Sequence, residues 1–238
     1  YSSAASDVYK RQYMRIRHKP WAKPELEACP FYISEPKLNR GHWNTIFPGE
    51  KKPLRLELGC GKGGFISQEA PANPDYHYIA MDIKNEMLVL AKRKLEAAYA
   101  EQQLPLDNVR IFICNLMQFS EYFSPEDRID RIYINFCNPW PKGKHKKRRL
   151  THPRQLQQYR TVLDGEIWFK TDDDELFEES ILYFQECGFD IVFQTTDLHK
   201  EPDIQSFRTE HEAMFEEMGK TIKFLIARPQ QTQQASAQ

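Results

Sequence analysis

The sequence predicts an α/β fold with a doubly wound, mostly parallel sheet of seven strands. Short apolar runs alternate with amphipathic segments from residue 54 to residue 227, which is the pattern of repeated strand–helix units. The first apolar run ends in the glycine-rich stretch GCGKGG, where such folds turn from strand to helix beside a ligand. Ligands of these sheets bind outside the carboxyl ends of the strands, so functional residues are expected there.

Seven segments have the composition of strands and are separated by turn residues or helical patterns. In order they are LRLEL (54–58), YHYIAMD (76–82), VRIFIC (109–114), RIYINF (131–136), GEIWFKT (165–171), FDIVFQT (189–195) and TIKFLIA (221–227). The expected helices are residues 65–70, 85–103, 153–163, 174–188 and 209–219. The helix at 85–103 has the clearest pattern, because its apolar residues recur at helical spacing. Gly188 is a helix stop signal.

Composition limits the possible classes of protein. The 238 residues are 40% hydrophobic and 13% aromatic, which is enough for a packed core. A net charge of −1 gives no information about a charged partner, so any electrostatic binding must come from local clusters of charge. Five cysteines without a C-x-x-C pair argue against a zinc site or a disulfide framework, and they suit the cytoplasm. No apolar run has the length of a membrane span or signal peptide, and no metal is expected.

The chain divides into four parts. Residues 1–13 are polar and aperiodic, so we expect a disordered extension, and Met14 is a candidate for the natural start. Residues 14–52 are rich in proline, tryptophan and basic side chains and are expected to form an irregular basic arm lying on the domain. Residues 53–228 form the strand–helix domain, and the low-complexity tail at 229–238 is expected to be disordered. No pattern specifies an oligomeric state.

The loop after the first strand is a candidate cofactor site. Gly59, Gly61 and Gly64 fit G-x-G-x-x-G, in which glycines permit a tight turn and close approach to a ligand. Asp82 ends the second strand, where an acid can bind ribose hydroxyls. The pattern fits S-adenosylmethionine, a dinucleotide, or a turn with no ligand. Glu57 favours S-adenosylmethionine, because a carboxylate in the strand would repel a pyrophosphate and attract an ammonium group.

The stretch YINFCNPWPKGKHKKRR (133–149) combines a strand end, the polar Asn138, two prolines around Trp140 and six Lys or Arg in eight residues. The prolines restrict the backbone, and Trp140 either stacks on a base or packs the turn. We interpret the basic run as a phosphate-binding track, extended by Arg15, Arg17, His18 and Lys19. The alternative is a solvated surface. The acidic stretch DDDELFEE (172–179) is expected to face away from it.

Several motifs together resemble the bacterial tRNA (guanine-N7-)-methyltransferase family. They are ELGCGKG, NFCNPWPKGKHKKRRL, FKTD and TEHE, with MRIRHKPWA near the start, and the resemblance covers nearly all of residues 14–228. It implies a Rossmann-like class I methyltransferase domain at 53–228. The implied reaction transfers a methyl group from S-adenosylmethionine to N7 of guanosine 46 in the variable loop of tRNA.

The resemblance also implies roles for individual residues. Those expected to bind the cofactor are Glu57, Gly59, Gly61, Gly63, Asp82, Asn115 and Asn138. Those expected to bind the substrate are Lys142, Asp172, Thr209, Glu210, His211 and Glu212, with His211 at a position that is often Tyr in the family. Those expected to contact RNA are Lys144, His145, Lys146, Lys147, Arg148 and Arg149. Asn115 can alternatively cap a helix, and Thr209 with Glu212 fits a capping box.

Asn138, the expected catalytic residue, departs from the family, which usually has Asp at this position. Guanine N7 has a free lone pair and no proton, so methylation there needs positioning and tolerance of positive charge, not a general base. Asn supplies a dipole where Asp would supply a charge. Two alternatives follow: an enzyme that methylates exocyclic amines, whose N-P-P-[YF] turn N-P-W resembles, and a catalytically silent RNA-binding protein. The retained Glu57, Asp82 and glycine loop argue against the second.

Overall fold

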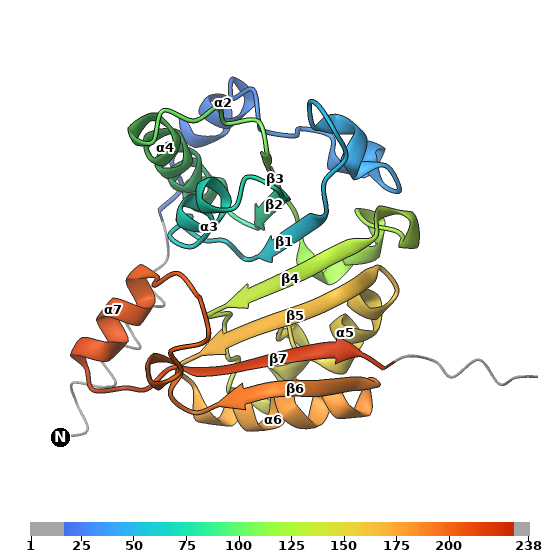
Figure 1. The fold of residues 1–238 in the computed structure, drawn as a ribbon, viewed down its shortest axis with the longest axis vertical. Coiled ribbons are helices and arrows are strands. Elements are labelled where there is room, and N and C mark those ends of the chain that lie inside the picture. Colours follow the sequence, from blue (N-terminus) through green and yellow to red (C-terminus); the bar gives the residue numbers. More distant parts are fainter. Residues whose placement is uncertain (1–16, 231–238) are drawn as a thin grey trace, which may run out of the picture.

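The computed structural model describes residues 17–230. The expected extension at 1–13, the basic Arg15 and the tail beyond residue 230 lie outside this part of the chain. In the described part, seven strands form one sheet in the order β3-β2-β1-β4-β5-β7-β6 (Figure 1). The strands are β1 (Leu54–Leu58), β2 (His77–Asp82), β3 (Val109–Ile113), β4 (Ile129–Asn135), β5 (Leu163–Thr171), β6 (Phe189–Thr195) and β7 (Lys223–Pro229).

The predicted mostly parallel sheet is confirmed. Strands β3, β2, β1, β4 and β5 run parallel, and β7 is antiparallel to both β5 and β6. The chain order reverses between β1 and β4, which is where α/β sheets place their ligands. Strand β7 continues to Pro229, one residue beyond the expected end of the domain.

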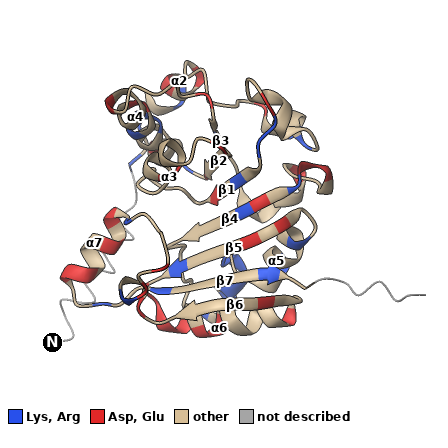
Figure 2. Cartoon of the chain, in the orientation of Figure 1, with Lys and Arg blue, Asp and Glu red and all other residues tan. Residues whose placement is uncertain are grey.

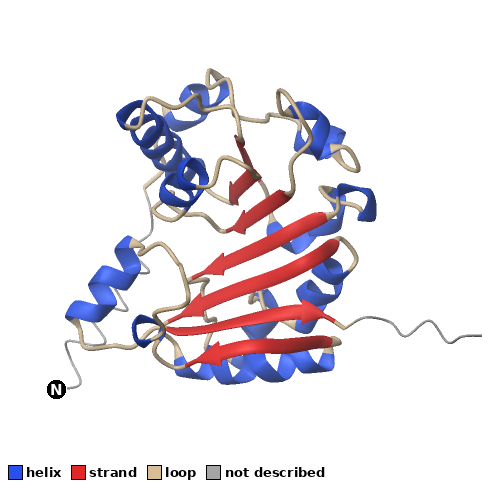
Figure 3. Cartoon of the chain, viewed as in Figure 1, coloured by secondary structure: helices blue, strands red, loops and turns tan. Residues whose placement is uncertain are grey.

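Helices cover the two faces of the sheet (Figure 3). They are α2 (Ala22–Glu27), α3 (Ile66–Ala72), α4 (Asn85–Glu101), α5 (Pro153–Arg160), α6 (Asp174–Glu186) and α7 (Glu210–Glu217). Short 3-10 turns lie at Pro36–Asn39, Trp43–Ile46, Leu116–Glu121, Pro125–Asp127, Gly143–Arg148 and Leu198–Lys200. Helices α3 and α4 pack near β2, and α4 also contacts β3, whereas α6 packs on β5, β6 and β7.

The N-terminal arm is more integrated than the sequence predicts. Trp43 is fully buried, its ring stacks on Phe112 with centroids 5.2 Å apart, and its Nε1 donates to the Tyr122 carbonyl at 2.8 Å. Tyr32 forms a parallel bridge with Ile111 of β3. The arm therefore completes the core beside β3. Its isolated aromatic residues lack periodicity, so sequence pattern alone could not reveal this burial.

Successive side chains of β1 point to opposite faces of the sheet. Leu54, Leu56 and Leu58 join the main apolar core, whereas Arg55 and Glu57 point to the opposite face. Because the first five strands are parallel, Glu57 of β1, Asp82 of β2, and the ends of β4 and β5 come together at one edge of the sheet. This edge contains the predicted site.

Candidate active site

Glu57 is a buried carboxylate with one oxygen unpartnered. The residue is 2% exposed, and its Oε1 accepts a hydrogen bond from Asn135 Nδ2 at 3.1 Å. Its Oε2 is buried and has no hydrogen-bond partner in the structure. Burial raises the pKa of Glu57 to about 8, although the Asn135 bond and the charge of Lys170 oppose this. Such an oxygen is costly to leave unpaired, so the position fits a cationic donor such as an ammonium group.

Three glycines shape the loop after β1. Gly59, Gly61 and Gly63 have φ angles of +76°, +54° and +76°, which favour glycine. A Cβ on Gly63 would lie 2.7 Å from Ala91 Cα, so α4 packs against this loop only because the residue is glycine. Gly64, the last glycine of the sequence fingerprint, does not have a positive φ. The close approach to α4 is made by Gly63 instead.

Asp82 is positioned by the same loop. Its Oδ2 accepts from the Gly61 backbone N–H at 3.0 Å, and its Oδ1 accepts from the Lys84 N–H at 2.9 Å. Burial raises the pKa of Asp82, and the backbone hydrogen bonds oppose that shift. Each carboxylate oxygen keeps further acceptor capacity, which suits hydroxyl groups of a ribose.

Asn115 caps the 3-10 turn that follows β3. Its Oδ1 accepts from the Met117 N–H at 3.1 Å, so the capping interpretation of this residue is confirmed. Its contact with the cofactor stays a prediction.

The turn after β4 holds its backbone in an unusual conformation. Phe136 and Trp140 have φ angles of +51° and +43°, in the left-handed region that non-glycine residues rarely adopt. Such residues cost about 1–3 kcal/mol each and occur frequently at functional sites. Asn138 Oδ1 accepts from the Trp140 N–H at 3.0 Å and so holds the turn. The Phe136 N–H donates to the Lys170 carbonyl of β5 at 2.9 Å, which attaches the turn to the sheet edge.

The basic run is divided between a buried and an exposed side. Arg149 is only 1% exposed, and its guanidinium contacts the Pro139 carbonyl, Glu179 and, at 3.4 Å, Glu175. Lys146 pairs with the same two carboxylates of α6, with Glu175 at 2.8 Å. The acidic stretch therefore faces the basic run, and the prediction that it faces away is wrong. A buried guanidinium needs partners, and α6 provides them.

Arg149 is buried and supports the Asn138 turn through the Pro139 carbonyl, and its expected contact with RNA stays a prediction. The exposed residues of the run are Lys142, Lys144, Lys147 and Arg148. Arg148 lies over the Trp140 ring, with Cζ 5.1 Å from its centroid, and His145 lies 5.8 Å from the same ring. Desolvation lowers the pKa of His145, and the charges of Arg148, Lys144 and Lys142 act in the same direction. Arg148 and His145 therefore lie beside Trp140 of the Asn138 turn.

The predicted substrate residues at the start of α7 lie between the Asn138 turn and α4. The expected capping box is confirmed, because Thr209 Oγ1 accepts from Glu212 N–H at 3.2 Å and Glu212 Oε2 accepts from Thr209 N–H at 2.7 Å. His211 stacks on Phe136, with centroids 5.9 Å apart and planes 19° apart, and burial lowers its pKa. Glu210 pairs with Lys94 of α4. The helix start is thus held against both the turn and α4.

Two carboxylates predicted to bind substrate differ in their availability. Glu212 is 1% exposed and already accepts from Lys170 at 3.0 Å, so its Oε2 is committed within the protein. Asp172, at the end of β5, pairs with Lys220 at 2.9 Å and has an 11% exposed side chain. Asp172 is therefore the more accessible of the two acids.

Sequence reasoning missed Asn135 and Lys170. Asn135 points to the same face of the sheet as Arg131 and Tyr133, opposite to Ile132 and Ile134, so the alternation of β4 could have placed it beside Glu57. Lys170 is buried between carboxylates, and burial lowers its pKa while Glu212 opposes the shift. Its partners lie far along the chain, so no local pattern identifies it.

Within residues 17–230, no group of three or more His, Cys, Asp or Glu side chains is placed to hold a metal ion. No helix in the same range is both long and apolar enough to cross a membrane.

Comparisons with known proteins agree with this geometry. A family model described as "Putative methyltransferase" matches residues 51–225. A tRNA (guanine-N(7)-)-methyltransferase of Clostridium beijerinckii is 58% identical over 216 residues, covering 90% of this chain and 98% of the relative. Enzymes with the same name from Clostridium perfringens (strain SM101) and Acetivibrio thermocellus are 55% and 53% identical, each covering 90% of this chain and 99% of the relative.

Solved structures show the same fold. An antibiotic-related methyltransferase has a TM-score of 0.55 at 18% identity, covering 83% of this chain and 94% of the other. The 16S rRNA methyltransferase KamB also has a TM-score of 0.55, at 12% identity, covering 79% and 91%. At these identities the likeness concerns the fold alone.

Proposed function

The chain belongs to the tRNA (guanine-N(7)-)-methyltransferase family, and we propose that it transfers a methyl group from S-adenosylmethionine to N7 of guanosine 46 in the variable loop of tRNA. The observation that carries this proposal is the position of two groups on adjacent parallel strands. Glu57, with its unpartnered oxygen, lies one residue before the end of β1, and the strained Asn138 turn follows β4. We propose the cytoplasm as the place of action, where tRNA is the partner.

The residues present fit the cofactor. S-adenosylmethionine supplies an activated methyl group on a sulfonium centre, and it carries an ammonium group and ribose hydroxyls. Glu57 would accept from the ammonium group through its free Oε2, and Asp82 would accept from the hydroxyls. The glycine loop allows its backbone to lie close to the ligand.

The protein's contribution to the chemistry is positioning and charge. Guanine N7 presents a lone pair without a proton, so no residue has to remove one. Asn138 would contact the reacting groups through its amide and hold the turn through its bond to Trp140. We assign the N1–H and NH₂ edge of guanine to Asp172, because Glu212 is buried against Lys170. A carboxylate there also favours the positive charge that develops on the base.

Cofactor affinity should depend on pH through Glu57. Burial raises the pKa of Glu57 to about 8 in the free protein, so at pH 6 it is mostly protonated and must lose a proton to bind a cation. Affinity for S-adenosylhomocysteine, which keeps the ammonium group, should rise up to about tenfold per pH unit from pH 6 to 8 and then level off. Calorimetry in two buffers of different ionisation enthalpy should detect proton release below pH 8, and constant affinity without proton release would contradict this.

The contribution of Glu57 to the stability of the free protein depends on pH in the opposite direction to cofactor affinity. Its folded pKa of about 8 exceeds the ordinary value of 4.5, so the folded protein binds more protons than the unfolded chain between these values. The free energy of unfolding contributed by this group therefore decreases as the pH rises through that window.

The exposed cations should determine the salt dependence of tRNA binding. In the triple variant Lys144→Ala, Lys147→Ala, Arg148→Ala, each lost phosphate contact should lower the slope of log K against log salt by about 0.7–0.9. Filter binding of unmodified tRNA at several salt concentrations measures this slope. Lys146→Ala is the matched control, because Lys146 pairs with α6 and should leave the slope unchanged. A triple variant with the wild-type slope would make the run a solvated surface.

Asn138 tests the choice between guanine N7 and an exocyclic amine. We expect labelled methyl from S-adenosylmethionine to appear in tRNA as 7-methylguanosine. Asn138→Asp should keep or raise the rate, because a carboxylate can make the same bond to Trp140 and adds negative charge near a cationic base. Asn138→Ala should lower the rate more.

Chromatography of the digested nucleosides identifies the product. If the wild type places methyl on an exocyclic amine of tRNA, and Asn138→Asp no longer forms that product, the protein is the alternative enzyme. The absence of any methylated nucleoside, with tRNA still bound, would establish the silent RNA-binding protein.

A further inference from the structure

Lys170 occupies the centre of the site without belonging to any of the contacts assigned above to cofactor or tRNA. Its ammonium group donates to Glu212 Oε2 at 3.0 Å, to Ser206 Oγ at 3.0 Å and to the Phe207 carbonyl at 3.1 Å. The side chain is 2% exposed. All three of its protons are thus used to hold the segment 206–212, which begins α7.

The same residue is attached to the cofactor side. In the sheet, Lys170 is directly opposite Asn135, whose side chain donates to Glu57. The Lys170 charge also acts on Glu57 and opposes the rise of its pKa. Lys170 Nζ lies 5.5 Å from the ring centroid of Phe65, at the start of α3, and 5.9 Å from that of Phe136, in the strained turn. One ammonium group therefore faces the cofactor acid, the turn and α7.

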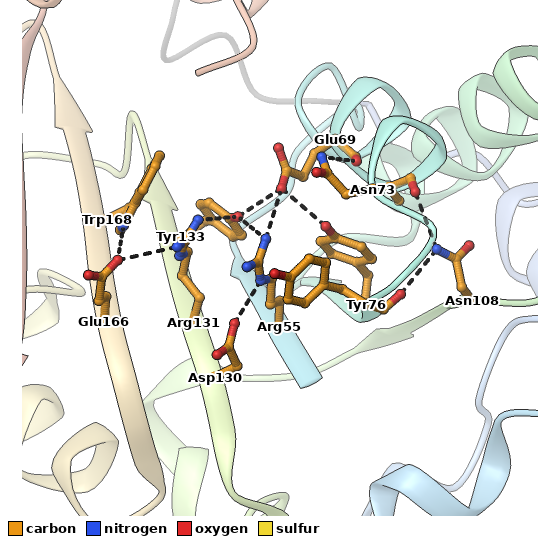
Figure 4. Close-up of polar contacts among 12 residues, drawn as sticks. Arg55, Glu69, Asn73, Tyr76, Asn108, Asp130, Arg131, Tyr133, Glu166 and Trp168 are labelled. Carbon is orange, nitrogen blue, oxygen red and sulfur yellow. Dashed lines mark hydrogen bonds and ion pairs between the residues drawn. The ribbon is translucent and has the colours of Figure 1, made fainter. Parts of the chain in front are cut away.

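The segment that Lys170 holds borders a cavity. Gln205, Ser206 and Phe207 line a cavity of about 540 Å³, whose other walls include Arg55, Arg131 and Trp168. The charged groups below pair with one another, as Figure 4 shows: Arg55 with Asp130 at 2.8 Å and Arg131 with Glu166 at 3.3 Å. Figure 2 shows basic and acidic positions next to one another across β1, β4 and β5. Lys170 and the packing of Phe207 against the apolar cluster beneath it together hold the segment on the sheet.

We propose that Lys170 is a positioning residue that couples occupancy of the cofactor site to the placement of residues 206–212, and hence to tRNA binding. The inference rests on the proposed function. Without a ligand, and above about pH 8 where Glu57 is ionised, the ammonium group of Lys170 is attracted both to Glu57 and to Glu212. A ligand cation on Glu57 removes the first attraction, so Lys170 binds Glu212 and the 206–207 segment more firmly. The start of α7 is then better ordered for tRNA, and by linkage tRNA should tighten cofactor binding by the same factor.

The test compares the dissociation constant of unmodified tRNA with and without saturating S-adenosylhomocysteine, above about pH 8 so that Glu57 is ionised in the free protein. In the wild type, the ligand should tighten tRNA binding by at least about fivefold. Lys170→Met, which removes the charge and keeps much of the length, should reduce this ratio to near one. Lys170→Arg, which keeps the charge, should restore part of it. Lys92→Met is the control, because Lys92 is a partly buried lysine paired with Glu25 and Glu96, away from this edge.

Several outcomes separate the possibilities. A Lys170→Met ratio equal to that of the wild type would overturn the inference, as would a wild-type ratio of one. Neither result affects the proposed function, which fails only if the wild type methylates no guanosine N7. If Lys170→Met does not fold, Glu212→Gln serves instead, because it weakens the bond to Lys170 and should lower the ratio. An unchanged ratio in Glu212→Gln would again overturn the inference.

Discussion

Replacing Glu57 with glutamine is expected to weaken binding of S-adenosylhomocysteine by about 1.5–3 kcal/mol, or roughly 10- to 150-fold. Glutamine keeps the shape of the side chain and can still accept from Asn135, but it removes the charge that faces the ammonium group. The pH dependence of binding should disappear together with the affinity. Isothermal calorimetry on both proteins between pH 6 and 8.5 measures both effects.

The same substitution should stabilise the free protein. Glu57→Gln removes a buried carboxylate whose Oε2 has no partner, so its free energy of unfolding should increase at pH 8. Weaker binding in a more stable protein could not be attributed to misfolding. Wild-type affinity in Glu57→Gln, or binding of NADH in place of S-adenosylhomocysteine, would show that Glu57 does not have the proposed role.

Arg149→Met is expected to have the largest effect on stability. The substitution leaves the Pro139 carbonyl without its guanidinium donor and weakens the attachment of the Asn138 turn to α6. Breaking a buried ion pair typically costs about 3–5 kcal/mol, and we expect about 3 because Glu179 keeps Lys146 as a partner. Urea denaturation measures the loss, and methyl transfer should fall with it.

Arg148→Met is the matched control for this prediction. Arg148 is the adjacent residue of the run and is exposed, so its substitution should change stability by less than about 0.5 kcal/mol. It should reduce the salt dependence of tRNA binding, whereas Arg149→Met should leave that slope unchanged in its folded fraction. If Arg149→Met were as stable as Arg148→Met and lowered the slope equally, Arg149 would be an RNA contact.

The sheet could be predicted from sequence because each strand carries its own local pattern. Strands at 54–58 and 189–195 match the expected bounds, and the others shift at one or both ends. β4 begins at Ile129, two residues before its apolar run, because Ile129 pairs with Leu163 of β5. The capping box of Thr209 and Glu212 could be predicted for the same reason: all of its atoms lie within four consecutive residues.

What sequence could not predict depends on contacts between distant residues. The pairing of Arg149 with Glu179 joins residues 30 apart, and that of Lys170 with Glu212 joins residues 42 apart. Both basic residues have the character of surface groups in the sequence, and only the packing of α6 and α7 makes them internal. The burial of Trp43 likewise requires β3 and the turn at Tyr122 to be in place.

The central claim is that one guanosine in the variable loop receives a methyl group at N7. The most direct test treats unmodified tRNA with the purified protein and S-adenosylmethionine, and then with borohydride and aniline, which cleave the chain at 7-methylguanosine. We predict cleavage at guanosine 46 alone, dependent on both the protein and the cofactor. Methyl incorporation without cleavage, or cleavage at another position, would contradict the account.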